Sequence, residues 1–405
     1  MSHEAAMIVG GGQTGAYAAM SLREAGFGGR IVVIGEEAHA PYDRPPLSKA
    51  MLTQEPMPAP APFHAPAKLD ERGIELRLAT RVVEIDRSAA RLRLADGATV
   101  PYDRLLLATG GTARHLAVPG GERALTVRTL EDAMAIRARL GQGVRVVCVG
   151  AGVIGLEVAA SARARGAEVT VLEAGAACMG RSLTPAFAQW LGALHEGAGV
   201  RLRFGVTVRE ITGEGVVCAD GVVPADVVIV GIGITRNTEL AVAAGLAVEG
   251  GIVVDEFCRT EDPAIFAAGD VAAFWHPFYG SRLRLEAWRH AMNHGIAAGR
   301  AMAGRREAYA DLPWFWTDQH GVNLQVAGLP ERAASSVLRG AMGGASFAVF
   351  HLDAEGCVVG ATGVNAAREI RAAQALIGLR RPADAAALAD PSRNLQGVVA
   401  AMRLG

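Results

Sequence analysis

The sequence lacks the cysteine spacings on which several classes of redox and metal protein depend. Its 405 residues include five cysteines, at Cys148, Cys178, Cys218, Cys258 and Cys357. They are widely separated, and no pair has the C-x-x-C or C-x4-C spacing. This excludes a redox disulfide, a zinc site or an iron–sulfur site built from local sequence. We expect reduced, mostly buried thiols and no bound metal.

Lysine and long apolar runs are also scarce. Lys49 and Lys68 are the only lysines, and the net charge of −1 gives no electrostatic reason to expect a nucleic-acid partner. No apolar run reaches membrane-spanning length, which argues against a membrane partner. The chain enters its first strand almost at once, which leaves no room for a targeting segment. These features favour a cytoplasmic protein.

What the sequence does contain is a glycine pattern, Gly10-x-Gly12-x-x-Gly15, between an apolar strand and an apolar helical pattern. The first glycine allows a tight turn, the second lets backbone approach a pyrophosphate, and the third lets the helix lie close to the strand. The helix N-terminus offers free N–H groups to phosphate. A second strand, 31–34, is followed by Glu36, which is placed to bind a ribose. This stretch predicts a dinucleotide site.

The same unit occurs a second time. The strand 146–149 leads into Gly150-x-Gly152-x-x-Gly155, and the strand 169–172 ends at Glu173. A single glycine pattern is a weak signal in a glycine-rich chain, but two copies with strand, helix and acid in register are specific. The chain is therefore predicted to bind two dinucleotides.

Each copy is followed by a similar series of strands. We expect two small antiparallel inserts, each closed by a buried strand that ends in a glycine turn. The strands expected in the first insert are 73–78, 81–86, 91–94 and 99–100, closed by 103–107; those in the second are 200–204, 206–211 and 216–218, closed by 226–234. The architecture is thus predicted to be internally duplicated.

The remaining segments differ in character. Residues 309–405 are expected to form an α+β domain with strands at 323–326, 347–352 and 358–364, then a helix at 366–379 and a short C-terminal helix. Residues 56–66 are rich in proline and alanine and should be an extended surface segment. Thr129 is a typical helix start.

Two loops place charge beside these units. In residues 41–49 the paired prolines predict a rigid, non-helical loop that can open a helix and that carries Arg44 and Lys49. These cations could meet phosphate or an electron-rich ring, or they could be solvated surface charges. A buried strand that ends in Gly269-Asp270 places a carboxylate where a ligand chain could pass.

Taken together, these motifs resemble the FAD-dependent, NADH-using ferredoxin reductases of bacterial oxygenase systems. These are proteins similar to putidaredoxin reductase and biphenyl dioxygenase reductase, within the glutathione-reductase-type flavoproteins. The resemblance covers essentially the whole chain. The stretches that carry it are 10–15, 41–49 (PYDRPPLSK), 108–110, 128–132, 150–157 (GAGVIGLE), 262–270 (DPAIFAAGD), 284–288 and 313–319 (PWFWTDQ).

The resemblance implies an α/β fold with two Rossmann-like domains of glutathione-reductase type and a C-terminal α+β domain. The FAD-binding domain would be discontinuous. Its expected bounds are 1–112 and 236–308, with the NADH-binding domain at 113–235 and the C-terminal domain at 309–405.

The resemblance also implies the residues that contact each cofactor. FAD would be held by Gly10, Gly12, Thr14, Gly15, Glu36, Arg44, Lys49, Val82, Ala108, Thr109, Gly110, Arg128, Asp270 and Trp288. NADH would be held by Gly150, Gly152, Ile154, Gly155, Glu157, Glu173 and Arg181. After Glu173 the family often has a Pro-Arg pair, which residues 174–180 lack. The resemblance therefore predicts the contacts to the adenine of NADH less directly than those of the glycine turn.

Three residues are expected at the reacting ring. Lys49 would favour electron density on the flavin, because a positive charge stabilises the reduced anion. Glu157 matches an acid near the nicotinamide, which the resemblance pairs with Lys49, and Trp316 matches an aromatic side chain against the flavin. The alternative role of Lys49 and Glu157 is a plain salt bridge that steadies the fold.

The implied activity is electron transfer from NADH through FAD to a [2Fe–2S] ferredoxin that serves a terminal oxygenase, either a Rieske dioxygenase or a cytochrome P450 in aromatic hydrocarbon catabolism. The alternatives are a reductase of rubredoxin or another acceptor, or a non-catalytic NADH sensor. A disulfide reductase of the same fold would need cysteines beside the flavin, and residues 45–49 contain none. The protein would be a monomer or homodimer. Arginines near the flavin-side motifs could attract the ferredoxin: Arg282, Arg284, Arg289, Arg305 and Arg306.

Overall fold

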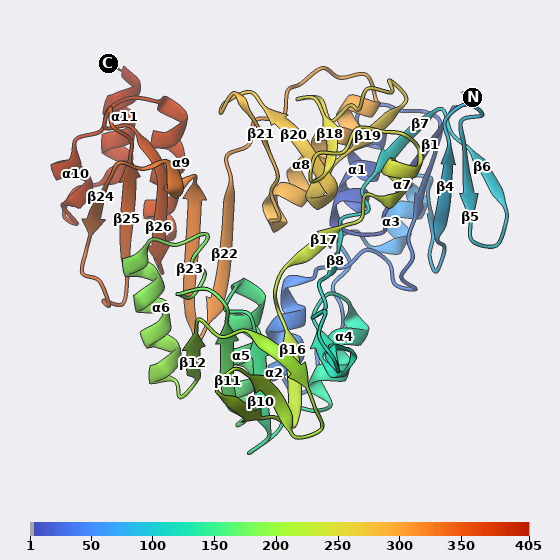
Figure 1. Cartoon of the computed structure of the whole chain (residues 1–405). Helices are drawn as coiled ribbons and strands as arrows, with labels where there is room; N and C mark the ends of the chain where they lie inside the picture. The colour runs from blue at the N-terminus through green and yellow to red at the C-terminus, as the bar shows by residue number, and fades with distance from the viewer. Residues whose placement is uncertain (1–3, 405) are drawn as a thin grey trace. The chain divides into compact units, whose positions relative to one another are not determined.

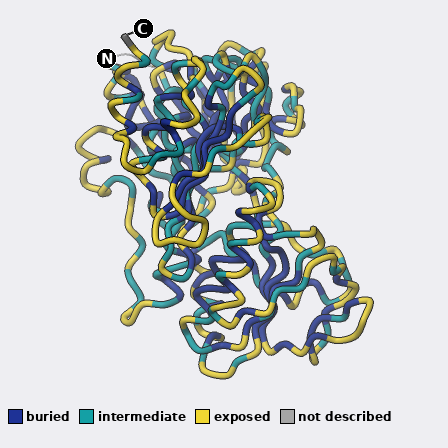
Figure 2. The backbone as a smooth tube through the Cα atoms, turned by 90° about the vertical axis from the view of Figure 1, so that its left-hand side faces the viewer, coloured by how far each residue is buried: buried dark blue, intermediate teal, exposed yellow. Residues whose placement is uncertain are grey.

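The computed structural model describes residues 4–404, and the chain divides into two compact units (Figure 1). The first unit contains the chain up to Asp43, then Ala59–Thr112 and Ile234–Asp311. The second contains Arg44–Pro58, Ala113–Gly233 and the chain from Leu312 onward. In Figure 2 the buried stretches of the chain, in dark blue, lie together in the interior, and exposed stretches, in yellow, lie mostly at the outside. Each unit is described separately below.

A five-stranded parallel sheet of order β19-β7-β1-β2-β3 forms the centre of the first unit. Its strands are β1 (Ala5–Val9), β2 (Arg30–Ile34), β3 (Ile74–Arg77), β7 (Arg104–Leu107) and β19 (Ile265–Ala267). Alternate residues of β1 pack into two different cores, with Met7 and Val9 on one face and Ala6 and Ile8 on the other. Both faces are therefore covered, which is why the strand is continuously apolar.

Two helices of the first unit are packed through glycine. Helix α1 (Gln13–Glu24) lies against α8 (Trp288–Met302). A β-carbon placed on Gly295 would stand 2.5 Å from the Thr14 carbonyl oxygen, and one on Gly299 would stand 2.4 Å from that of Ala18. Only glycine permits this close approach of two helix backbones.

Smaller elements complete the first unit. Two three-stranded sheets have the orders β4-β5-β6 and β18-β20-β21, and β8 with β17 forms a two-stranded sheet. The bounds are α3 (Pro66–Glu71), β4 (Val82–Asp86), β5 (Arg91–Leu94), β6 (Thr99–Pro101), β8 (Gly111–Ala113), β17 (Ile234–Arg236), α7 (Glu239–Ala243), β18 (Ile252–Val254), β20 (Ala272–His276) and β21 (Ser281–Leu283).

The second unit repeats the plan with a parallel sheet of order β12-β11-β10-β16-β9. Its elements are β9 (Leu125–Thr126), α4 (Leu130–Arg137), β10 (Arg145–Val149), α5 (Val153–Ala164), β11 (Glu168–Glu173), α6 (Pro185–Gly197), β12 (Arg201–Phe204) and β16 (Val227–Val230). An antiparallel insert follows, with β13 (Val208–Ile211), β14 (Gly215–Cys218) and β15 (Gly221–Pro224). As expected, Thr129 caps α4, through a reciprocal capping box with Asp132.

The last part of the second unit is an antiparallel sheet of order β22-β23-β26-β25-β24 with helices after it. Its elements are β22 (Trp314–Gln319), β23 (Val322–Gly328), β24 (Ser335–Arg339), β25 (Phe347–Leu352), β26 (Val358–Val364), α9 (Ala367–Leu379), α10 (Ala385–Ala389) and α11 (Leu395–Leu404). The α+β character expected from the sequence is confirmed. The short segment η1 (Pro45–Ser48) and α2 (Ala50–Thr53) also belong to this unit.

Two strands were assigned to the wrong sheet by the sequence pattern. We expected the strands at 73–78 and 200–204 in the antiparallel inserts, but β3 and β12 pair in parallel with β2 and β11. Each follows a helix, α3 or α6, that returns the chain to the same end of the parallel sheet. A short alternating strand has the same pattern in either sheet, so the crossover helix before it decides the pairing.

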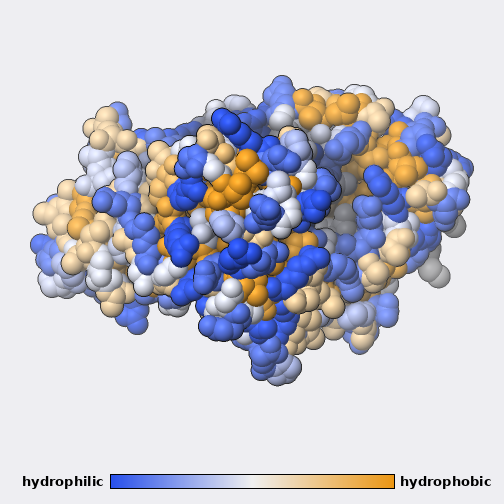
Figure 3. All heavy atoms as spheres, turned by 60° about the horizontal axis from the view of Figure 1, so that its bottom comes forward, coloured by the Kyte–Doolittle hydropathy of each residue, from blue (hydrophilic) through white to orange (hydrophobic). Residues whose placement is uncertain are grey.

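The surface mixes polar and apolar residues. On the face that Figure 3 shows, hydrophilic residues surround several separate groups of apolar ones. Among residues 4–404, none of the helices has both the length and the hydropathy of a membrane-spanning segment.

Candidate functional site: two dinucleotide turns and a buried ion pair

The first glycine turn is shaped by close backbone contacts. Gly10 has a φ of +130°, and a β-carbon there would stand 2.1 Å from the Ala108 carbonyl oxygen. A β-carbon on Gly15 would stand 2.1 Å from the Gly10 carbonyl oxygen, whereas one on Gly12 would meet nothing within 4 Å. Gly12 therefore borders open space, which suits the approach of a pyrophosphate.

The second turn has the same construction. Gly150 has a φ of +103°, and a β-carbon on Gly155 would stand 2.0 Å from the Gly150 carbonyl oxygen. A β-carbon on Gly152 would meet only the Gly231 carbonyl oxygen, at 3.7 Å. Helices α1 and α5 both begin without a side-chain cap and without an acid in the first turn. Both N-termini therefore leave N–H groups available, and the two turns fit dinucleotide phosphates.

The two predicted ribose acids differ in their surroundings. The side chain of Glu36 is 70% exposed and has Arg81 3.6 Å away. The carboxylate of Glu173 accepts hydrogen bonds from the backbone N–H groups of Ala151 and Gly175, both at 2.6 Å. Glu173 is thus fixed against its own glycine turn, in the position where an acid binds ribose hydroxyls.

Other residues of the first unit that we predicted to contact FAD lie in three different places: on α1, in the turn after β7, and in the apolar core. The Thr14 hydroxyl donates to the Ala291 carbonyl oxygen at 3.0 Å, so its side chain is directed to α8. The Thr109 hydroxyl donates to the Asn237 carbonyl oxygen at 2.7 Å, beside Ala108 and Gly110 in the turn that follows β7. Val82 lies in the apolar core.

Two further FAD candidates of the first unit lie at the starts of helices. Trp288 is the first residue of α8, and its indole N–H donates to Asp43 Oδ1 at 2.7 Å. Asp270 lies in the short helix η3 (Gly269–Val271), and its carbonyl accepts from Arg236 at 2.8 Å. The geometry does not test whether these residues contact FAD, so their roles stay predictions.

A buried ion pair lies at the middle of α5. Glu157 is 2% exposed, and its Oε1 is 2.9 Å from Lys49 Nζ. The Ser48 hydroxyl donates to Glu157 Oε2 at 2.5 Å, and the Thr317 hydroxyl donates to Oε1 at 2.7 Å. A buried carboxylate is tolerated only when it is paired and hydrogen-bonded, and here three donors satisfy it. The predicted pairing of Lys49 with Glu157 is therefore present.

Ser48 and Thr317 are functional candidates that the sequence pattern missed. Both flank residues that the resemblance singled out, Lys49 and Trp316, and each presents a hydroxyl to the same carboxylate. Their signal in the sequence was adjacency within the motifs PYDRPPLSK and PWFWTDQ. Nothing in the sequence indicated that these two motifs meet at one acid.

The remaining predicted residues of the second unit are less buried than Glu157. Arg44 donates to the Arg128 carbonyl oxygen at 2.5 Å. Trp316 stacks on Trp314 with ring centroids 5.3 Å apart, and its indole N–H donates to Asp318. Ile154, near the start of α5, is 38% exposed. Arg181 is exposed in the turn that precedes α6.

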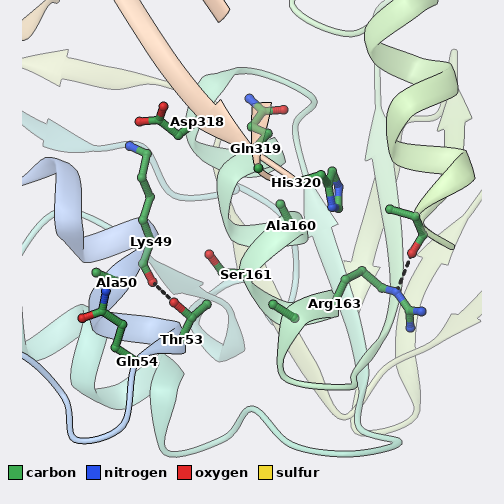
Figure 4. Close-up of a pocket in the computed structure, with 13 residues that line it drawn as sticks. Lys49, Ala50, Thr53, Gln54, Ala160, Ser161, Arg163, Asp318, Gln319 and His320 are labelled. Carbon is green, nitrogen blue, oxygen red and sulfur yellow. Dashed lines mark hydrogen bonds between the residues drawn. The ribbon is translucent and has the colours of Figure 1, made fainter. Parts of the chain in front are cut away.

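A cavity of about 650 Å³ lies beside Lys49, within the second unit (Figure 4). Lys49 and Thr53 border it from the α2 side, Ser161 and Arg163 from α5, and His320 from the turn after β22. Arg163 donates to the carbonyl oxygens of Ala198 and Ala167, at 3.1 and 2.5 Å, so its guanidinium supports the fold at this cavity.

The five cysteines are all free thiols, and four of them are buried. Burial raises the pKa of Cys148 and of Cys178 to about 12. A thiol of such high pKa is a poor nucleophile at neutral pH. None of the five lies in the segment 45–49, so the geometry gives no support to dithiol chemistry beside Lys49.

Two of the arginines that we expected to attract a ferredoxin donate hydrogen bonds to backbone carbonyl oxygens of the first unit. Arg282 donates to the carbonyl oxygens of Val254 and Ala273, both at 3.0 Å. Arg284 donates to the Glu249 carbonyl oxygen at 3.1 Å. Arg305 and Arg306 are exposed. The docking role of all these arginines stays a prediction.

The chain is similar to known proteins over nearly its full length. The family model described as "Pyridine nucleotide-disulphide oxidoreductase" matches residues 5–295, and one described as "Reductase C-terminal" matches residues 314–399. The ferredoxin–NAD(+) reductase component of an anthranilate 1,2-dioxygenase system of Burkholderia cepacia is 43% identical over 403 residues, covering 98% of this chain and 99% of that protein.

Two further comparisons agree. Putidaredoxin reductase of Pseudomonas putida is 36% identical over 412 residues, covering 98% of this chain and 97% of that protein. The crystal structure of the covalent putidaredoxin reductase–putidaredoxin complex matches with a TM-score of 0.94 at 35% identity, covering all of both chains. With its two parallel-sheet dinucleotide units and its C-terminal β domain, this chain belongs to the pyridine nucleotide-disulphide oxidoreductase family and carries that family's reductase C-terminal domain.

Proposed function

We propose that the protein is an FAD-dependent NADH:ferredoxin oxidoreductase. The observation that carries the proposal is similarity over the full length, at 36–43% identity, to relatives named as reductases of oxygenase systems. The two open glycine turns supply what such an enzyme needs, one for each dinucleotide. When bound, the flavin supplies the chemistry, because it accepts a hydride from NADH and gives up electrons one at a time.

In this proposal the residues of the chain bind and orient the two cofactors. Gly12 and Gly152 leave room for the two pyrophosphates, and the N-termini of α1 and α5 face them with N–H groups. Glu173 is held ready to accept hydrogen bonds from the NADH ribose, and Glu36 has the corresponding place for FAD. Lys49 and Glu157 carry the two charges of the site, and Trp316 offers an aromatic surface. None of these side chains has to transfer a proton for a hydride to move.

The physiological acceptor is proposed to be a small acidic [2Fe–2S] ferredoxin that serves a Rieske dioxygenase or a cytochrome P450. Similar proteins include the reductase component of an anthranilate 1,2-dioxygenase system and a ferredoxin reductase for a CYP199A2 system. With a net charge of −1, any attraction must come from a local patch such as the exposed Arg305 and Arg306. The protein is proposed to work in the cytoplasm as a monomer or homodimer.

The test is reduction of cytochrome c by NADH in the presence of a [2Fe–2S] ferredoxin, with direct reduction of ferricyanide as the control. We expect ferredoxin-dependent turnover that falls as salt is raised, because salt screens charges over roughly 8 Å at physiological ionic strength. Ferricyanide reduction should change little. An acceptor role for the ferredoxin is wrong if rubredoxin or a disulfide substrate supports turnover and no [2Fe–2S] ferredoxin does.

The same preparation tests whether the protein is an enzyme at all. NADH added without air should bleach the bound flavin within the turnover time. A flavin that stays oxidised while NADH binds would indicate a sensor. A ferredoxin-dependent rate that is unaffected by salt would remove only the electrostatic part of the proposal.

A further inference from the structure

A row of buried polar side chains leads away from Glu157 inside the second unit. Gln319 Nε2 is 2.9 Å from the Thr317 hydroxyl, which in turn contacts Glu157. His195 Nε2 is 2.7 Å from Gln319 Oε1, and His320 Nε2 is 3.1 Å from His195 Nδ1. Thr317, Gln319 and His195 are 1%, 3% and 0% exposed. No sequence pattern indicated a role for any of these residues.

The row joins three elements and ends at the cavity. Glu157 is on α5, Thr317 and Gln319 are on β22, and His195 is in the last turn of α6. His320 lies in the two-residue turn between β22 and β23, where it adopts a φ of +50° that is uncommon for a residue other than glycine. It is partly exposed and lines the cavity of Figure 4.

The hydrogen atoms of this row can be assigned from donor and acceptor capacity. An ionised Glu157 only accepts, so the single hydroxyl hydrogen of Thr317 points to it. Thr317 must then accept from the amide NH₂ of Gln319, which leaves the amide oxygen facing His195. An amide oxygen only accepts, so the hydrogen of neutral His195 is on Nε2 and its Nδ1 accepts from His320.

We propose that Thr317, Gln319 and His195 are positioning residues, which form a one-way chain of hydrogen bonds that holds the Glu157 carboxylate in a single rotamer as the partner of Lys49. His320 is the outer end of the chain. Every donor points toward the carboxylate, so each bond reinforces the next. The functional part of the inference rests on the proposed function, in which Lys49 and Glu157 act where NADH meets the flavin.

The charges around the outer end are compatible with this assignment. Burial lowers the pKa of His195 to about 4, and burial together with Arg163 lowers the pKa of His320. Lys49, Arg163 and Asp318 are the charged groups that line the cavity beside His320. His195 is therefore neutral at physiological pH, as its donation from Nε2 and acceptance at Nδ1 require, and the lowered pKa of His320 favours its neutral form.

Gln319→Glu is the variant that tests the direction of the chain. In its ionised form the introduced carboxylate accepts from His195 but gives no hydrogen to Thr317, so two carboxylates compete for one hydroxyl hydrogen. In its protonated form the new carboxyl group restores the missing donor, and burial beside Glu157 raises its pKa. We expect kcat/KM for NADH with ferricyanide to fall about tenfold at pH 8 and to recover largely by about pH 6. The wild type should show no such recovery.

The matched control is Gln325→Glu on the neighbouring strand β23. Gln325 accepts from Trp314 and donates to Asn323, so both ends of its amide have partners outside the row that leads to Glu157. It should not show acid recovery. A second pair of variants, His195→Gln and His195→Leu, asks whether polarity or packing matters: glutamine can donate and accept at once and should retain most of the rate, whereas leucine cannot.

The readout that does not depend on activity is the tautomer of His195. In flavin-loaded protein labelled with ¹⁵N-histidine, NMR should show the Nε2–H tautomer of His195 without titration between about pH 5.5 and 8. An Nδ1–H tautomer, a midpoint near the ordinary value, or a pH-independent loss in Gln319→Glu equal to that of Gln325→Glu would overturn the proposal. If the tautomer and acid recovery are found and no ferredoxin supports turnover, the proposed acceptor fails while the chain stands.

Discussion

The two helices that follow the glycine turns begin alike and are used differently. The buried polar residues of α1 are hydroxyls, Thr14 and Ser21, and both donate to carbonyl oxygens of α8. Helix α5 carries the buried Glu157 and the buried Ser161, whose hydroxyl donates to the Ser48 carbonyl oxygen. One helix is fixed by close packing of small residues, and the other carries a charge that three side chains must satisfy.

This difference follows from what each helix packs against. Against α8, glycines at 295 and 299 bring two backbones together and leave no room for an ionised group. Against η1 and β22, α5 meets residues with hydroxyl and ammonium groups, so a carboxylate can be buried there. The same motif can therefore form a rigid support in one copy and a reactive site in the other.

The largest expected effects concern the glycines that make the two copies alike. Gly15→Ala and Gly155→Ala would place a β-carbon about 2 Å from a backbone carbonyl oxygen, so each helix must move off its strand. Overpacking of this kind costs about 1–3 kcal/mol or more. We expect a large fall in the thermal midpoint for both, measured by circular dichroism.

Gly12→Ala is the control for that experiment, because its β-carbon meets no atom of the chain within 4 Å. It should keep the fold and lose flavin, measured as absorbance at the flavin band per polypeptide. A Gly12→Ala protein with full flavin content would contradict the assignment of this turn to the cofactor.

The next effect concerns the ion pair found only in the second copy. Lys49→Met leaves the Glu157 carboxylate buried without its cation, and breaking a buried pair costs about 3–5 kcal/mol. Because Lys49 is partly exposed and two hydroxyl groups still donate to the carboxylate, we expect the actual cost to fall below that range and below the cost of the two glycine variants. Urea unfolding of Lys49→Met, Glu157→Gln and the double variant would give the coupling energy.

A coupling near zero in that cycle would show that the pair adds nothing to stability. The double variant is expected to be more stable than Lys49→Met alone, because it removes the unpaired charge. If NADH affinity is unchanged in all three variants, the pair is a plain salt bridge, which is the alternative that the sequence left open.

Replacement of each of the two ribose acids should have a moderate effect, on NADH for Glu173 and on FAD for Glu36. Glu173→Ala should reduce the preference for NADH over NADPH, because the acid repels a 2′-phosphate and no positive residue lies between 174 and 180. We expect kcat/KM for NADH to fall about tenfold. Glu36→Ala should leave this preference unchanged and weaken FAD retention. Comparable turnover of the wild type with NADPH would contradict the assignment of Glu173.

The smallest effect should come from the cysteines, which neither copy uses for chemistry. Burial raises the pKa of Cys148, in the strand before the second turn, and of Cys178, so neither forms a thiolate at neutral pH. Replacing each of the five singly by alanine should leave ferricyanide reduction largely intact. Loss of flavin reduction in a folded single variant would reveal a redox thiol.

The duplicated architecture could be predicted from the sequence alone. Two glycine turns, each preceded by an apolar strand and followed by a strand and an acid, fix local backbone geometry, and local geometry can be read from neighbouring residues. For the same reason the strands β25 and β26, helix α9 and the cap at Thr129 were predicted nearly to the residue. The resemblance also paired Lys49 with Glu157.

Only the tertiary structure decided which sheet each short strand joins and what surrounds Glu157. The strands β3 and β12 look like their antiparallel neighbours in sequence, and their crossover helices determine the parallel pairing. More than a hundred residues separate Glu157 from both Ser48 and Thr317 in the sequence. The same holds for His195 and its two partners, Gln319 and His320. A hydrogen bond between such distant residues leaves no periodic trace in a sequence, because it depends on how whole elements pack and not on the spacing within them.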